Sequence, residues 1–127
     1  MSLFFNEIHL MASIAQVIFM DIYEEASVLN EMLRDLRDSI KHRSLSPVEV
    51  MNEINSLTDI ATRLQTRLNP IMFRSMWMCK EDRNAIEDVI DVLARVKSIN
   101  QSISLIDMNH DGSFYKHALN AIEFNDF

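Results

Sequence analysis

Apolar side chains recur every three or four residues along most of the chain, which is the period of one face of an α-helix. A first helix is predicted from about Leu3 to His42, and its apolar stripe contains two successive four-residue steps around Ile22. Its members are Ile8, Met11, Ala15, Ile18, Ile22, Ala26, Leu29, Leu33, Leu36 and Ile40. The pattern predicts one long helix whose heptad seam carries a stutter, where supercoiling locally unwinds.

The N-terminal half of this helix also carries a second apolar ridge. The ridge consists of Leu3, Leu10, Ile14 and Val17, and it stops at Asp21. Because this half is then apolar on two sides, it needs two packing partners. We therefore expect these four residues to belong to a partner-binding surface.

The motif Ser46-Pro47-Val48-Glu49 is typical of a helix start. Ser46 can cap a free amide, Pro47 suits the first helical position and Glu49 completes a capping box. A regular seam follows, made of Val50, Ile54, Leu57, Ala61, Leu64, Leu68 and Ile71. Asn69-Pro70 is predicted to end or kink this second helix, or to start a short new one.

A third helix is predicted from about Glu81 to Ile106. Its seam consists of Ile86, Val89, Leu93, Val96, Asn100 and Ile103. Asn100 at a seam position could fix the helix register. The alternative, in which Ile99 takes the core place and Asn100 faces water, fits the pattern equally well. A short fourth helix, about Ser113 to Phe124, could cover the second ridge of the first helix.

These patterns predict a single all-α domain over residues 1–127, with three long helices and a short C-terminal one. Forty helical residues extend about 60 Å, whereas a compact chain of 127 residues has a diameter of roughly 36 Å. The first helix therefore overshoots a globule. We expect an elongated bundle with coiled-coil-like seams that self-associates.

Composition narrows the function classes. The chain contains 1 Gly, where average usage of about 7% would give roughly nine. The glycine-rich phosphate loops, dinucleotide-binding turns and nucleophile elbows of many enzymes each need two or more glycines, so none can exist here. No acid–base pair or nucleophile constellation has suitable spacing either. The sequence therefore predicts a non-enzymatic protein.

Charge and location follow from the remaining composition. The net charge of −7 argues against nucleic acid as a partner and is compatible with a basic protein. The N-terminus lacks the basic start of a signal peptide, and polar residues interrupt its apolar stretch, so we expect no membrane span and a cytoplasmic location. The lone Cys79 requires no oxidising compartment.

Within residues 103–119, Asp107, Asn109 and Asp111 alternate along the chain, and Gly112, the single glycine, follows them. The segment resembles the helix end and metal loop of an EF-hand, with these residues at loop positions one, three, five and six. Ser113 would offer its carbonyl at position seven. The loop departs from the family at position twelve, where Ala118 replaces the bidentate Glu. The resemblance implies weak calcium binding at most and no other cofactor. The alternative is a helix–loop–helix turn in which Asp and Asn side chains cap backbone groups.

A second candidate site lies between Arg63 and Lys80, a segment without acidic residues in an acidic chain. On a continuous helix its arginines fall on one side, surrounded by Met and aromatic residues, which are enriched in protein interfaces. The candidate partner-binding residues are Arg63, Arg67, Met72, Phe73, Arg74, Met76 and Trp77. The alternative places the segment in the core, with the arginines paired to neighbouring acids.

Three function classes remain. The first is a protein–protein interaction protein, such as a helical-bundle chaperone, adaptor or assembly subunit. Its long first helix is similar to subunits and chaperones of bacterial type III secretion filaments, which would imply a secretion system. The second is an acidic inhibitor or immunity protein that neutralises a basic partner. The third is a calcium-responsive protein built on the EF-hand-like loop.

Overall fold

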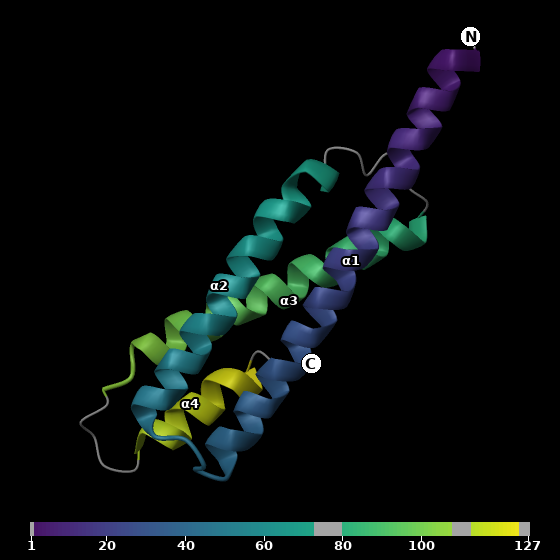
Figure 1. The fold of residues 1–127 in the computed structure, drawn as a ribbon. Helices are drawn as coiled ribbons and strands as arrows, with labels where there is room; N and C mark the ends of the chain where they lie inside the picture. The colour runs from purple at the N-terminus through teal and green to yellow at the C-terminus, as the bar shows by residue number, and fades with distance from the viewer. Residues whose placement is uncertain (1, 73–79, 108–112, 125–127) are drawn as a thin grey trace.

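The computed structural model describes residues 2–72, 80–107 and 113–124, with side chains from residue 16 onward. Four helices make up this part of the chain, as the pattern predicted (Figure 1). They are α1 (Ser2–Lys41), α2 (Pro47–Met72), α3 (Lys80–Ser104) and α4 (Ser113–Phe124). The prediction of an all-α bundle with three long helices and one short C-terminal helix is confirmed.

The three long helices pack against one another, and α4 packs against α1 and α3. Figure 1 shows α4 beside the C-terminal part of α1, near the loop that leads into α2. This position differs from the expected one, because the second ridge lies toward the opposite end of α1. Val17, the described member of that ridge, is 69% exposed. The fourth helix therefore does not cover the ridge.

The core follows the predicted seams with one correction in α1. Phe19 is buried at 4% exposure, whereas Ile18, which the sequence placed in the seam, is 43% exposed. The buried positions of α1 are Phe19, Ile22, Ala26, Leu29, Leu33, Leu36 and Ile40. Their steps alternate regularly between three and four, so from Phe19 onward the seam has no stutter. Phe19 continues the alternation of three- and four-residue steps that Ile22 and Ala26 follow, whereas Ile18 would break it.

All seven predicted seam residues of α2 are buried, and the helix continues through Pro70 to Met72. The predicted capping box is also present at its start. The Ser46 amide donates to Glu49 Oε1 at 3.1 Å, and the Glu49 amide donates to Ser46 Oγ at 3.2 Å. The bond from the Ser46 amide, and after it the Ser46 side chain, lower the pKa of the Glu49 carboxyl, because they favour its charged form.

The structure decides which of Ile99 and Asn100 is the seam residue of α3. Ile99 is completely buried in the core, so Asn100 is not a seam residue. Asn100 does not simply face water, however. Its side-chain amide donates to Thr58 Oγ1 at 2.7 Å and to Asn55 Oδ1 at 3.1 Å, both on α2. The amide therefore links α3 to α2 at the edge of the core.

The end of α1 uses an unexpected residue for a left-handed turn. Arg43 has φ of 53°, a conformation that usually favours glycine. The Ser44 amide donates to the Ser39 carbonyl at 2.9 Å, and the Arg43 amide donates to the Ile40 carbonyl at 3.1 Å. The six-residue closure from Ser44 back to Ser39 is typical of a Schellman cap. The Arg43 guanidinium also lies 5.2 Å from the centre of the Tyr115 ring, which fixes this loop against α4.

Candidate interaction surface

Arg67 is the predicted site residue whose surroundings are clearest. It donates to Asp21 Oδ2 at 2.6 Å and to Glu25 Oε2 at 2.7 Å, so one α2 side chain holds two acids of α1. These contacts, with the hydrogen bond to Asp21 first, raise the pKa of the guanidinium further above its high ordinary value. At this position the alternative of an arginine paired to neighbouring acids is the one observed.

The rest of the arginine-rich segment is only partly described. Arg63 is exposed and lines a groove of about 490 Å³ between α1 and α2, together with Val28 and Met32 of α1. Met72 is half-exposed at the end of α2. The other predicted members of this segment lie outside the described residues, and they are Phe73, Arg74, Met76 and Trp77. Whether the segment is an interface stays a prediction.

The outward side of α1 carries apolar residues that the sequence analysis only partly identified. Val17 belongs to the predicted ridge, whereas the side chains of Leu3, Leu10 and Ile14 lie outside the described ones. Val28 at 57% and Met20 at 67% exposure were not predicted. Val28 could have been found, since it follows Asp21 by seven residues and so returns to the same face.

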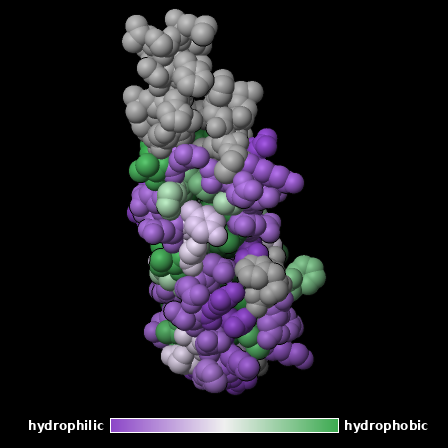
Figure 2. Space-filling view, turned by 90° about the vertical axis from the view of Figure 1, so that its right-hand side faces the viewer, coloured by the Kyte–Doolittle hydropathy of each residue, from purple (hydrophilic) through white to green (hydrophobic). Residues whose placement is uncertain are grey.

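Figure 2 shows the side of the molecule on which α1 lies in Figure 1. Hydrophilic side chains dominate the described surface, and small hydrophobic areas interrupt it, including one at its upper edge. A second groove, of about 580 Å³, runs between α1 and α3 and is lined by Phe19, Met20, Tyr23 and Ala85. Val28 and Met20 therefore lie beside grooves on the two sides of α1.

The α1 helix is also longer than its neighbours. It has 40 residues and α2 has 26, a difference of 14 residues or about 21 Å. Near the end of α2, Arg67 contacts Asp21 of α1. At the start of α3, Asp82 accepts a hydrogen bond of 2.8 Å from the side-chain amide of Gln16 of α1. In Figure 1 the N-terminal turns of α1 project beyond the described ends of α2 and α3. We call the backbone segment 2–15 the overhang.

The EF-hand-like segment lies at the opposite end of the bundle. Asp107 is exposed and Ser113 begins α4, while Asn109 and Asp111 lie outside the described residues. Tyr115, at loop position nine, donates its hydroxyl to the Leu45 carbonyl at 2.7 Å. No group of three or more metal-ligating side chains occurs among the residues the structure describes. Calcium binding stays a prediction.

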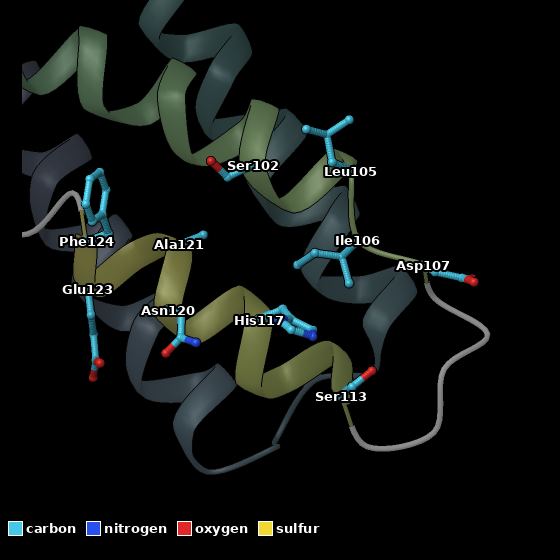
Figure 3. A pocket seen from close by; sticks show the side chains of 10 residues that line it. All are labelled: Ser102, Leu105, Ile106, Asp107, Ser113, His117, Asn120, Ala121, Glu123 and Phe124. Carbon is cyan, nitrogen blue, oxygen red and sulfur yellow. The ribbon is translucent and has the colours of Figure 1, made fainter.

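An open groove of about 810 Å³ separates the end of α3 from α4 near this segment. Figure 3 shows the side chain of Asp107 pointing away from α4, and Ile106 lying between the two helices. Leu105 and Phe124, on either side of the groove, are almost fully exposed. The groove is open to solvent and its lining is mixed, because polar side chains alternate with the apolar ones around it: Ser102, Asp107, Ser113, His117, Asn120 and Glu123.

Within residues 2–72, 80–107 and 113–124 no helix is long and apolar enough to cross a membrane. Comparison with protein-family models, curated proteins and solved structures finds no significant match for this chain. Its function must therefore be argued from its own surface.

Proposed function

We propose that the protein is a non-enzymatic helical interaction protein, acting as an adaptor, chaperone or assembly subunit, and that it binds a protein partner through α1. The binding surface consists of the overhang and the outward face that carries Val17, Met20 and Val28. One observation carries the proposal: α1 extends past the described ends of α2 and α3, and Val17, Met20 and Val28 are exposed on its outward side.

Burial of apolar area explains why this surface would bind. Residues 2–20 contain a single acid, Glu7, and no Lys or Arg, whereas the whole chain has a net charge of −7. Each buried Val or Met side chain contributes about 1.5 to 3 kcal/mol when removed from water. A surface of low charge with several such residues is typical of a protein interface core.

A photo-crosslinking experiment tests the proposal in cells that produce the protein. Benzoylphenylalanine is placed at Val17 and, as a control, at Val48, which is an exposed Val on the first turn of α2. We expect ultraviolet light to give one discrete covalent adduct from position 17, either with this chain or with another protein. Position 48 should give none.

Absence of any adduct from position 17, or equal adducts from both positions, contradicts the proposal. Mass spectrometry of the adduct identifies the partner. Its identity then separates a self-associating assembly subunit from an adaptor or chaperone that binds a different protein.

A further inference from the structure

The flank of the bundle between α1 and α3 is covered by a fourth helix over only part of its length. Toward the C-terminal end of α1, α4 packs against both helices and buries Phe114, Ala118 and Ile122. Near the end of α4, Ile122 lines a small cavity together with Asn30 of α1 and Arg95 of α3. Arg95 donates to Asn30 Oδ1 there at 3.2 Å. This flank therefore already accepts one amphipathic helix.

A groove continues along the same flank toward the N-terminus of α1, where α3 crosses behind α1 in Figure 1. It consists of two adjoining hollows of about 280 and 580 Å³, and Tyr23 lines both of them. Asn30 lines one end, and at the other end Gln16 donates to Asp82 at 2.8 Å. Among the residues that the structure describes, none from α4 lines this groove. From Gln16 to Asn30 the α1 wall is about 21 Å long, which a helix of about fourteen residues would span.

The groove has an apolar lining. Phe19 and Val89 are buried, while Met20 at 67% and Tyr23 at 41% exposure remain open to solvent. The rings of Phe19 and Tyr23 pack at a tilt, with their centres 6.1 Å apart, and this contact holds the exposed tyrosine in place. Aromatic and Met side chains are enriched in protein interfaces. The lining therefore favours a protein partner over a small polar ligand.

The charges that line the groove in the described part of the chain are all negative. They belong to Glu24 and Glu31 of α1 and to Asp82 and Asp88 of α3. Glu31 contacts Arg34 at 3.6 Å, and Asp82 accepts the hydrogen bond from Gln16. Neither Glu24 nor Asp88 has an ion-pair partner among the described residues. Both walls thus present an uncompensated carboxylate to the same space.

The other flank of α1 shows how such acids are satisfied within this fold. There Arg67 of α2 contacts Asp21 at 2.6 Å and Glu25 at 2.7 Å, so a neighbouring helix supplies the positive charge. In the groove, α3 supplies Asp82 and Asp88 instead. Because opposite charges across an interface favour association and select the partner, the missing component is a basic one.

We propose that the α1–α3 groove binds an amphipathic helix of a second protein, whose apolar face is flanked by Lys or Arg. The apolar face covers Met20 and Tyr23, and the basic side chains pair with Glu24 on one wall and Asp88 on the other. This is the helix-in-groove mode of recognition, and it continues along the flank that α4 occupies. A second copy of the chain suits the groove less well, because its net charge is −7.

The groove goes beyond the surface proposed above. That surface consists of the overhang and the outward face of α1, and Met20 is the residue of α1 that borders both. A basic side chain that lies over Tyr23 adds a cation–π contact, of the kind that Arg43 makes with Tyr115 at 5.2 Å. The inference therefore specifies both the site and the chemistry of its ligand.

Fluorescence anisotropy with the full-length chain tests the inference. The probe is a fluorescein-labelled synthetic peptide of fourteen residues, with Leu every three or four positions and Lys on both sides of that face. One control peptide has the same composition in scrambled order, and another has Glu in place of Lys. We expect the probe to bind with a dissociation constant at least tenfold lower than that of either control.

Two double variants with the same change in net charge locate the binding. Glu24→Gln with Asp88→Asn removes the two uncompensated carboxylates of the groove. Glu53→Gln with Asp59→Asn removes two exposed carboxylates of α2, outside the groove. We expect the first pair to weaken binding of the probe at least tenfold and the second pair to weaken it less than twofold. All four positions are exposed, so thermal melts should show both variants folded like the parent.

Four outcomes overturn the inference. They are no binding of the probe up to millimolar concentration, equal binding of the scrambled peptide, equal weakening by the two double variants, and a dimer by light scattering that Glu24→Gln with Asp88→Asn dissociates. The last would show that a second copy occupies the groove. The adduct from position 17 is measured separately, so the proposed function can stand when the probe fails to bind.

Discussion

The two ends of α1 differ in what surrounds them. From Phe19 to Ile40 every seam residue is buried, because α2, α3 and, near the C-terminal end, α4 pack against that side. The overhang has the same kind of sequence, with an apolar residue every three or four positions, but it extends past α2 and α3. The comparison teaches that a seam predicts a contact without saying whether the contact lies within the chain or between chains.

The largest expected effect is on the free energy of unfolding, in the part of the bundle where the helices pack against one another. Leu57→Ala removes a completely buried side chain of α2 and leaves a cavity, so it should lower the free energy of unfolding by about 2 to 5 kcal/mol. Urea denaturation followed by circular dichroism measures the loss. The control Leu105→Ala changes a leucine that is 87% exposed and should cost less than about 0.5 kcal/mol. Equal losses would show that α2 is not packed as described.

The next effect is on association and not on stability. Val28→Asp adds a charge to the outward face of α1 that we propose as the binding surface, so we expect the yield of the covalent adduct from position 17 to fall at least tenfold. Quantitative immunoblotting of the crosslinked product measures the yield. Val48→Asp is the matched control, since both valines are 57% exposed, and it should leave the yield unchanged. If both variants lowered the yield equally, the outward face of α1 would not be the interface.

Loss of the helix cap should have a smaller effect. Ser46→Ala removes the hydroxyl that accepts the Glu49 amide, and we expect unfolding to become easier by about 1 kcal/mol near neutral pH. The stabilisation that the Glu49 carboxylate adds to the folded state is present above the ordinary pKa of a carboxyl group. It is lost as the pH falls through the lowered pKa that Glu49 has in the folded state. The Ser46 amide is kept in the variant and only the part that the Ser46 side chain adds is lost, so the difference between variant and parent should shrink only slightly in acid. Thermal melts at several pH values measure the difference, and a variant as stable as the parent at neutral pH would contradict the capping box.

The smallest effect is expected at the α1–α2 ion pairs. Arg67→Ala breaks the contacts with Asp21 and Glu25, and since all three side chains are well exposed we expect a loss of at most about 1 kcal/mol. The loss should diminish in about 1 M salt, where such pairs are screened. Arg63→Ala, one turn earlier on α2, serves as the control. A loss that salt does not change would mean that the Arg67 stem contributes by packing instead.

The bundle was largely predictable because its signals are local. The helix start at Pro47, its capping box and the seven-residue seam of α2 follow from residues close together in the sequence. The candidate surface was less predictable. Val17 was identified, and Val28 was missed although its spacing from Asp21 indicates the same face. Met20 was missed because Ile18, Phe19 and Ile22 beside it are apolar too, so the pattern alone does not say which of them faces solvent.

By itself, then, the sequence determined the all-α class, the four helices and the seam of α2, since hydrophobic periodicity and capping act within one helix. The tertiary structure decided which of two adjacent residues enters the core, as with Phe19 over Ile18 and Ile99 over Asn100. It also decided that α4 packs near the C-terminal part of α1 and that Arg67 holds two acids of that helix. Those outcomes depend on where the neighbouring helices lie, and a periodic pattern along one helix contains no information about distance to another.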